Sequence, residues 1–155
     1  MATIILVSCG ASKNTNPSPA RELYTGALFR NSLAYAEKLG GDKIFILSAL
    51  HGLVELDTLI APYNVTLSPV SKKVKKKHPD LRVLDANEKK AWALTVTAQL
   101  ANVANLGEDV FIFLAGESYI KPLRKHIVHL EEPLKGLRFA FRVQHIKQLI
   151  LVQED

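Results

Sequence analysis

Three continuous apolar runs constrain the fold of this chain more than any other feature. They lie within residues 2–8 (ATIILVS), 42–48 (DKIFILS) and 109–115 (DVFIFLA), the segments expected to be strands, and each contains β-branched residues. Runs of this kind are typical of strands buried on both faces, as in parallel sheets. A strand, helix, strand order favours parallel pairing through a right-handed crossover. We therefore predict a single α/β domain over residues 1–155, a layered fold with a small, mostly parallel central sheet of three or four strands flanked by helices.

Apolar residues at helical spacing predict the helices that flank this sheet. The expected ranges are residues 20–39, 85–106, from just after Tyr119 to about 129, and 139–153. Gly26 divides the first range into a short turn and a main helix, and either Asp85 or Asn87 caps the second. In the last helix, Arg142 and Gln144 flank His145, and this polar edge could face a crevice.

A lysine-rich stretch carries much of the positive charge. The chain has a formal net charge of +5, and residues 71–80 (SKKVKKKHPD) contain too few apolar side chains to cover a core. This stretch is expected to be an exposed helix or a flap that ends near Pro79. It is either a solvated face or a grip on a phosphate backbone, and its lysines are Lys72, Lys73, Lys75, Lys76 and Lys77.

Several classes of protein are disfavoured by composition and spacing. The single cysteine, Cys9, has no internal disulfide partner, which suggests a reducing compartment. No apolar run approaches the length of a membrane span or a signal-peptide core. No Cys/His pair has metal-ligand spacing, and no nucleotide-cofactor fingerprint is present. We expect a cytoplasmic protein without a membrane partner, a metal or a cofactor, and we leave its oligomeric state open.

Small, polar and glycine residues follow each apolar run, in the loops SCGASK, SALHGL and AGES. Because parallel strands place their carboxyl ends at one edge of the sheet, these loops are expected to share a crevice. The alternative is that the glycines and serines only make tight turns after the strands. The crevice residues would be Ser8, Cys9, Lys13, Ser48, His51, Gly116, Glu117 and Tyr119.

Reactive and basic side chains extend this prediction. His51 and Asp57 could act as an acid and base, because imidazole titrates near neutrality and a carboxylate can position water or stabilise a developing cation. Each could instead be a loop cap or a surface charge, and Cys9 could be a nucleophile or a small packed residue. Arg21 and Tyr24 open the first helix beside the crevice, where they suit a phosphate or a base, or are simply solvated.

Five segments together resemble a family of uncharacterised bacterial and phage domains: SCGASK, ARELYTGALFR, ILSALHGLV, APY at Tyr63, and AGESY. That family has a serine-cysteine-lysine loop and an alanine-arginine-acid-leucine-tyrosine helix start, and the likeness spans residues 4–151. His51 stands where the family usually has tyrosine. More remotely, LSALHGL and DTLIAPY are similar to a loop of YaaA-type peroxide-stress proteins, which bind DNA, and to the archaeosine-synthase core and the uracil-DNA-glycosylase-like α/β group.

The resemblance implies that the partner is nucleic acid or a nucleobase. Our leading hypothesis is an N-glycosidase-like hydrolase in phage defence that acts on a modified base or nucleoside in DNA, by excision or exchange. The alternatives are a non-catalytic DNA-binding stress or defence module, and an enzyme acting on free nucleotides. In the leading hypothesis Asp57 and His51 are catalytic, Ser8, Cys9 and Ser48 form the pocket floor, Tyr24 or Tyr63 stacks on the base, and Lys13 and Arg21 hold flanking phosphate.

Overall fold

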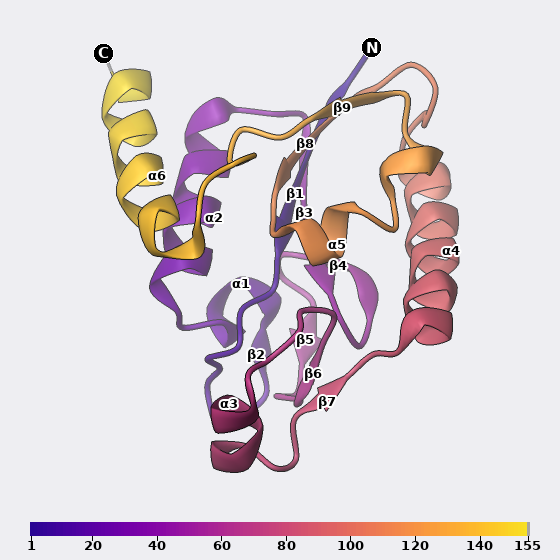
Figure 1. Ribbon diagram of the computed structural model, residues 1–155. Coiled ribbons are helices and arrows are strands. Elements are labelled where there is room, and N and C mark those ends of the chain that lie inside the picture. Colours follow the sequence, from indigo (N-terminus) through magenta and orange to yellow (C-terminus); the bar gives the residue numbers. More distant parts are fainter. Residues whose placement is uncertain (155) are drawn as a thin grey trace.

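A five-stranded sheet in the order β4-β3-β1-β8-β9 forms the centre of the computed structural model, which describes residues 1–154 (Figure 1). Neighbouring strands pair in parallel except β4, which is antiparallel to β3. The prediction of an α/β fold with a mostly parallel sheet is confirmed, and Asp155 of the expected domain lies outside the described residues. The strands are β1 (Thr3–Ser8), β3 (Lys43–Ser48), β4 (Gly52–Glu55), β8 (Val110–Leu114) and β9 (His129–Glu131).

Strand β1 lies in the middle of the sheet because apolar residues cover both of its faces. Ile5 pairs with Ile44 on one neighbouring strand and with Ile112 on the other. Ile4 and Leu6 point into the core on one side of the sheet, and Ile5 and Val7 into the core on the opposite side. All four are fully buried, and burial of each such side chain contributes about 1.5–3 kcal/mol.

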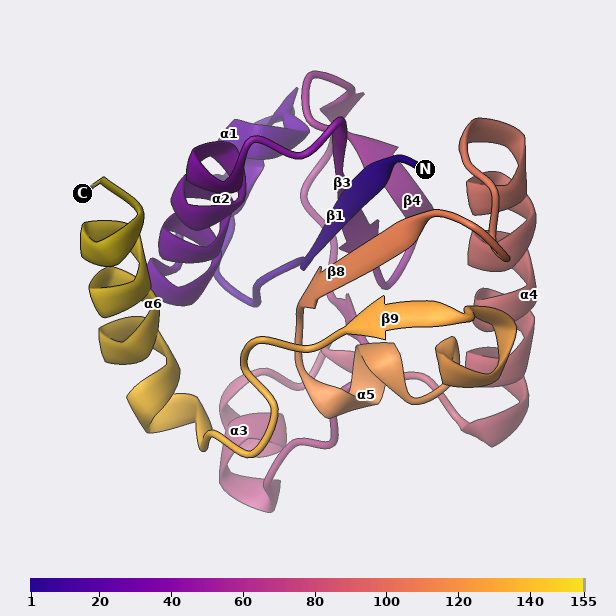
Figure 2. The same ribbon diagram turned by 90° about the horizontal axis from the view of Figure 1, so that it is seen from above.

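Helices cover both faces of the sheet (Figure 2). The helices α2 (Ala27–Leu39) and α6 (Phe139–Glu154) lie side by side against one face, and α4 (Ala86–Val103) covers the other. Gly40 ends α2 with a left-handed φ of +68°, which favours glycine. Asp85 caps α4 in a capping box with Glu88. None of the helices within residues 1–154 is long and apolar enough to cross a bilayer.

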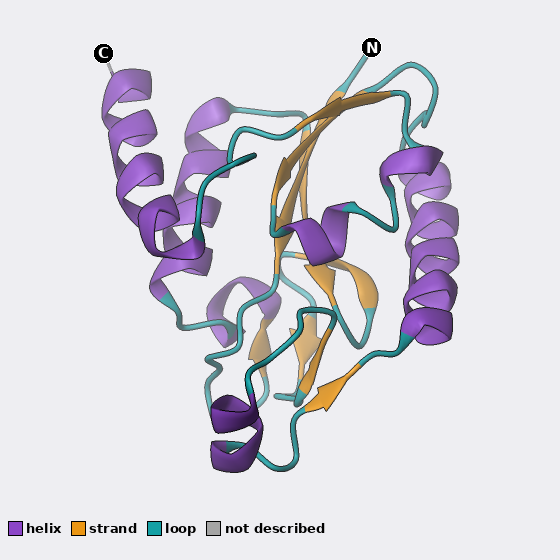
Figure 3. Ribbon diagram, in the orientation of Figure 1, coloured by secondary structure: helices purple, strands orange, loops and turns teal. Residues whose placement is uncertain are grey.

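Short elements gather beyond the carboxyl ends of the sheet strands (Figure 3). Two small two-stranded sheets, β2 with β5 and β6 with β7, lie there together with the lysine-rich helix α3. These elements narrow the space around the strand ends, where the sequence predicts a crevice. Their bounds, with those of the other short helices, are β2 (Ser18–Pro19), α1 (Ala20–Leu23), β5 (Leu59–Ile60), β6 (Val65–Thr66), α3 (Lys72–Lys77), β7 (Arg82–Val83), α5 (Glu117–Ile120) and the 3₁₀ helix η1 (Arg124–His126).

Two sheet-edge strands differ from the prediction. The helix expected from just after Tyr119 to about residue 129 is wrong, because α5 ends at Ile120 and the chain then forms the three-residue helix η1 and the edge strand β9. β9 has only three residues, so its sequence carries no detectable alternation. β4 was expected to be loop, but Gly52 adopts a φ of +76° and turns the chain back along β3. The helix predicted over residues 85–106 ends earlier, at Val103.

Hydrogen bonds to Asp109 stabilise the sheet next to the amino-terminal ends of β1 and β8. They also make the free energy of unfolding depend on pH. The Asp109 carboxylate accepts hydrogen bonds from the backbone amides of Ala2 and Asn105, each at 2.8 Å. The bond from Asn105, followed by that from Ala2, lowers the pKa of Asp109. Because the folded-state pKa is depressed, the stabilisation is present above the ordinary aspartate pKa of about 3.9 and is lost as the pH falls through the folded-state value.

We therefore expect Asp109→Asn to lower the melting temperature at pH 7, with a gap from the wild type that narrows below about pH 4. Melting curves measured by circular dichroism between pH 7 and pH 3 would test this. The matched control is Asp80→Asn, because Asp80 is exposed and its replacement should leave the melting temperature unchanged. A gap of constant size across this pH range would contradict the expectation.

Candidate functional site

A cavity of about 850 Å³ opens at the carboxyl ends of β1 and β8. It is bounded by the loop after β1, the start of α2, the segment that carries β6 and α3, the β8–α5 turn and the start of α6. This volume lies within the range of about 300–1,000 Å³ typical of small-molecule sites. Polar residues in its lining include Cys9, Lys13, Thr66, His78, Tyr119 and Arg142, together with Ser8, Ser12, Ser32, Asn64 and Ser68, and Gly116 also lines it.

Cys9 and Tyr119 form one polar wall of the cavity. The Cys9 amide donates to the Leu47 carbonyl at 2.9 Å, which extends the β1–β3 pairing by one residue. The Sγ atom of Cys9 lies 3.4 Å from the Tyr119 hydroxyl, which lies 3.5 Å from Oγ1 of Thr66. Burial raises the pKa of Tyr119. The phenol therefore stays protonated near neutral pH and can donate a hydrogen bond to a ligand.

Lys13 lies on the loop after β1, and backbone bonds on both sides hold that loop. The Asn14 amide donates to the Leu23 carbonyl at 2.8 Å, and the Thr25 amide donates to the Ser12 carbonyl at 3.0 Å. The Lys13 Nζ atom lies 4.6 Å from the centroid of the Tyr63 ring and donates to the Ala11 carbonyl at 3.3 Å. Burial lowers the pKa of Lys13. Its amine is therefore neutral more often than that of an exposed lysine.

A chain of hydroxyl groups lies behind the lining of the cavity. The Tyr24 and Tyr63 hydroxyls are 2.5 Å apart, and Tyr63 is 2.7 Å from Oγ of Ser48. The His51 amide donates to that Oγ at 3.0 Å, and the Trp92 indole donates to the Ser48 carbonyl at 2.8 Å. Burial raises the pKa of both tyrosines, so both stay neutral. The two rings support Lys13 from behind and are absent from the cavity lining.

Arg142 is a site residue that the sequence analysis noted only as a neighbour of His145. Its Nη1 donates to the Ala115 carbonyl at 2.9 Å and its Nε donates to the Leu137 carbonyl at 3.0 Å. Burial lowers the pKa of Arg142, but a guanidinium remains charged in proteins. The sequence signal was its place beside Gln144 and His145 on a polar edge of a mainly apolar helix. The structure places Arg142 in the cavity lining and His145 outside it.

Glu117 lies beside the cavity and is held by an arginine. Both of its oxygens accept from Arg124, at 2.7 and 2.9 Å, and Arg124 also donates to Glu132 at 2.8 Å. Arg124 lowers the pKa of Glu117, which keeps the carboxylate ionised. Glu117 borders a separate small pocket of about 90 Å³ that Arg142 also lines. It is thus a carboxylate close to the cavity whose charge is largely balanced.

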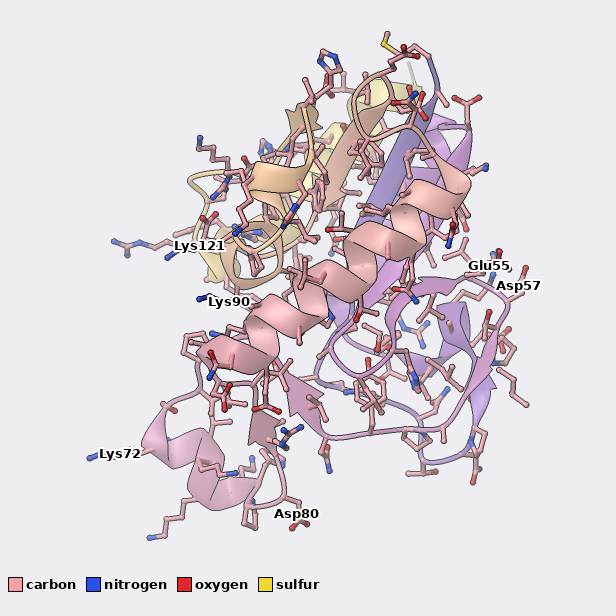
Figure 4. All side chains as sticks on the ribbon, turned by 90° about the vertical axis from the view of Figure 1, so that its right-hand side faces the viewer. Glu55, Asp57, Lys72, Asp80, Lys90 and Lys121 are labelled. Atoms are coloured by element: carbon pink, nitrogen blue, oxygen red, sulfur yellow. The ribbon has the colours of Figure 1, made fainter. Side chains whose placement is uncertain are left out.

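The predicted catalytic pair lies outside the cavity. The Asp57 side chain is 81% exposed and accepts from Nε of Arg21 at 2.9 Å. Because β4 runs antiparallel to β3, it carries Glu55 and Asp57 away from the strand ends. Figure 4 shows both at one margin of the molecule, opposite Lys72. His51 is exposed, and the centroid of its ring lies 5.6 Å from that of Tyr63 in an edge-on arrangement. The structure therefore does not bring Asp57, His51 and Arg21 together with Cys9 and Lys13.

The lysine-rich segment forms the exposed helix α3. An exposed helix was one of the two structures expected for it, the other being a flap. Ser71 caps the helix by accepting from the Val74 amide at 3.2 Å. Lys75 is held by the carbonyls of Pro79 and Leu81. Val74, His78 and Leu81 turn towards the cavity, whereas Lys72 projects outward (Figure 4). The same short segment thus contributes to the cavity wall and carries exposed positive charge.

Comparison with known proteins gives a family without an assigned activity. A family model described as "Family of unknown function (DUF6884)" matches residues 4–148. No curated protein matches this chain, and no solved structure matches it. Within residues 1–154, no group of three or more His, Cys, Asp or Glu side chains is placed to hold a metal ion.

Proposed function

This chain belongs to the DUF6884 family, whose function is unknown, and we propose that it is an N-glycosidase-like enzyme that breaks the glycosidic bond of a modified base in DNA. The observation that carries this proposal is the cavity at the carboxyl ends of β1 and β8, whose lining combines apolar surface with Lys13 and Arg142. The resemblance to DNA-binding YaaA-type and uracil-DNA-glycosylase-like proteins supports the same substrate class.

The cavity has the properties that an extruded base requires. Its lining includes Phe29 and Leu114, which offer apolar surface to a flat ring, and the hydroxyls of Tyr119 and Thr66, which suit the polar edge of a base. Enzymes that act on a base in DNA take it out of the stack into such a pocket and read its edge by hydrogen bonds. Together, apolar walls and a row of neutral donors favour a nucleobase over an aliphatic ligand.

Cleavage of the glycosidic bond develops charge on both the base and the sugar. When the glycosidic bond breaks, its electron pair goes to the departing base, and the sugar carbon becomes cation-like. The fixed guanidinium of Arg142 can stabilise the negative charge on the base, which is an electrostatic form of catalysis. Water then adds to the sugar carbon, which keeps the hydroxyl group, and the released proton goes to the departing base. The products are a free base and an abasic sugar, whose open form carries an aldehyde at C1′.

Helix α3 would hold the DNA strand at the mouth of this cavity. We expect replacement of Lys72, Lys73, Lys76 and Lys77 by glutamine to weaken DNA binding and to flatten its salt dependence. Each lost phosphate contact reduces the slope of log K against log salt by about 0.7 for single strands and 0.9 for duplexes. Fluorescence anisotropy at several salt concentrations would measure this.

The control for the α3 variant removes four lysines elsewhere: Lys90, Lys121, Lys125 and Lys147, all of them exposed. The two variants have the same net charge, so a difference in slope reports the location of the contacts. Equal slopes of log K against log salt in the two variants would exclude α3 as the element that binds the DNA phosphates.

The direct test is to incubate the protein with DNA of natural and modified composition and to assay released base and alkali-labile abasic sites. Release of one modified base, with natural bases left in place, is the expected result. A second candidate, a non-catalytic DNA-binding module, is favoured by one observation: within the described residues, no aspartate or glutamate lines the main cavity. Such a module would bind DNA with the same salt dependence and release no base from any substrate. An enzyme acting on free nucleotides would instead work without DNA and tolerate the α3 substitutions.

A further inference from the structure

We propose that Lys13 is a nucleophilic amine that forms an imine with a sugar aldehyde held in the cavity, namely C1′ of an abasic nucleotide. The substrate class rests on the proposed function, whereas the covalent step is an additional activity. The supporting observations are the position of the amine, its surroundings and the lack of an acidic partner.

Lys13 differs in position from the lysines of α3. Its loop is fastened to residues 23–25 by two backbone bonds, and its Nζ lies over the rings of Tyr63 and Tyr24, at 4.6 and 5.7 Å from their centroids. The side chain also lines the cavity next to Cys9. The amine is therefore held on a fixed element at a place where a ligand can reach it.

Among the residues that the structure describes, no acidic side chain neutralises this amine. Within residues 1–154, Lys13 forms no ion pair with an aspartate or a glutamate, and its amine donates to a neutral group, the Ala11 carbonyl. The two ring faces stabilise the ammonium in part through cation–π contact, but they do not replace a carboxylate, and the loss of hydration leaves the ammonium less stable than one in water. Burial, the larger influence, lowers the pKa of Lys13 against the opposing influence of Cys9. Desolvation of this kind is a known way of activating lysine as a nucleophile towards carbonyl groups.

The covalent step balances without an oxidant or a reductant. The lone pair of the neutral Nζ adds to the aldehyde carbon and gives a carbinolamine. The carbon–oxygen bond then breaks, and the oxygen leaves as water with protons that come from the amine and the medium. The product is an imine between Nζ and C1′, which water can hydrolyse to restore both partners. The protonated hydroxyl of Tyr119, in the same lining, is a donor suited to the departing oxygen.

The test supplies the aldehyde directly. A single-stranded oligonucleotide with one preformed abasic site is incubated with the full chain and sodium cyanoborohydride, which reduces an imine to a stable amine. We expect an adduct that peptide mass spectrometry locates at Lys13, and at least a tenfold lower yield with Lys13→Arg, which keeps the charge but lacks the amine. The matched control is Lys90→Arg on helix α4, an exposed lysine outside both α3 and the cavity lining, which should trap as well as the wild type.

Each outcome decides the proposal. An adduct located on the lysines of α3, an equal yield with Lys13→Arg, or no adduct despite measured oligonucleotide binding would each overturn it. Mapping on the wild-type chain decides the matter even if the variant folds poorly. Trapping without base release from any intact DNA would reject the proposed function and keep this inference, whereas base release without trapping would do the reverse.

Discussion

Replacing Arg142 with glutamine is expected to slow base release by about 100-fold or more at saturating DNA, since removal of one preorganised charge stabiliser commonly costs a factor of 10²–10³ in turnover. Arg142 is the cavity cation whose charge does not depend on pH near neutrality. Its two carbonyl contacts, at 2.9 and 3.0 Å, fix where that charge lies. Single-turnover kinetics with the modified DNA would measure the loss, because they isolate the chemical step from product release.

The matched control for this variant is Arg138→Gln. Arg138 is exposed, lies just before α6 and is absent from the cavity lining, so its replacement removes the same charge without changing the site. We expect its rate to stay within about twofold of the wild type, as is usual for surface changes. Melting temperatures of both variants separate a loss of catalysis from a loss of folding. A well-folded Arg142→Gln protein with the wild-type rate would remove Arg142 from the mechanism.

Replacing Tyr24, which lies behind the cavity lining, with alanine is expected to lower the free energy of unfolding by about 3–5 kcal/mol, as for other large aromatic-to-alanine changes. Tyr24 is fully buried, and the centroid of its ring lies 4.9 Å from that of Phe29. Its hydroxyl forms a hydrogen bond with the hydroxyl of Tyr63. The change leaves a cavity and removes one end of the hydroxyl chain behind Lys13. Urea denaturation followed by circular dichroism would measure it.

Two tyrosine-to-phenylalanine variants divide this effect into packing and hydrogen bonding. Tyr24→Phe keeps the ring and removes the bond to Tyr63, for which we expect a loss of about 1 kcal/mol. Tyr35 is buried on α2, and its hydroxyl has no hydrogen-bond partner within residues 1–154, so Tyr35→Phe should be nearly neutral. If Tyr24→Ala were no more destabilising than Tyr35→Phe, the proposed structural role of the Tyr24 ring would be wrong.

The fold was predictable where burial on both faces leaves a clear mark on the sequence. Strands β1, β3 and β8 have continuous apolar interiors because helices cover both faces of the sheet, and such runs need no long-range information to be recognised. β9 is different because it is a three-residue edge strand with exposed ends. Its pairing with β8 is a long-range contact that three residues do not reveal, so this strand was missed.

Only part of the candidate site was predictable from the sequence. The turn at Gly52, between β3 and β4, explains the part that was not. The strand-end loops do bring Cys9, Lys13 and Tyr119 to one cavity, as parallel pairing requires. Asp57 was expected there because it follows a strand closely in sequence. However, the reversal at Gly52 sends β4 antiparallel along β3 and carries Asp57 away. The direction of a short hairpin depends on pairing that the local sequence does not reveal.

Arg142 lines the cavity although the sequence did not identify it as a site residue. It reaches the cavity from the last helix, where it bonds to the Ala115 carbonyl just after β8. Its place depends on how α6 packs beside α2 at the end of the chain, and this packing is a tertiary property. Residues that reach a site from distant helices carry no spacing motif, so single-sequence reasoning detects them only as charges in apolar surroundings.

The central claim, that a nucleobase occupies the strand-end cavity, is tested most directly by a crystal structure of this protein with a short single-stranded DNA that carries the released base. We expect the base to lie within the 850 Å³ cavity, between the Cys9–Tyr119 wall and the guanidinium of Arg142, with the flanking phosphates against α3. An empty cavity in a crystal that contains bound DNA elsewhere on the molecule would contradict the account.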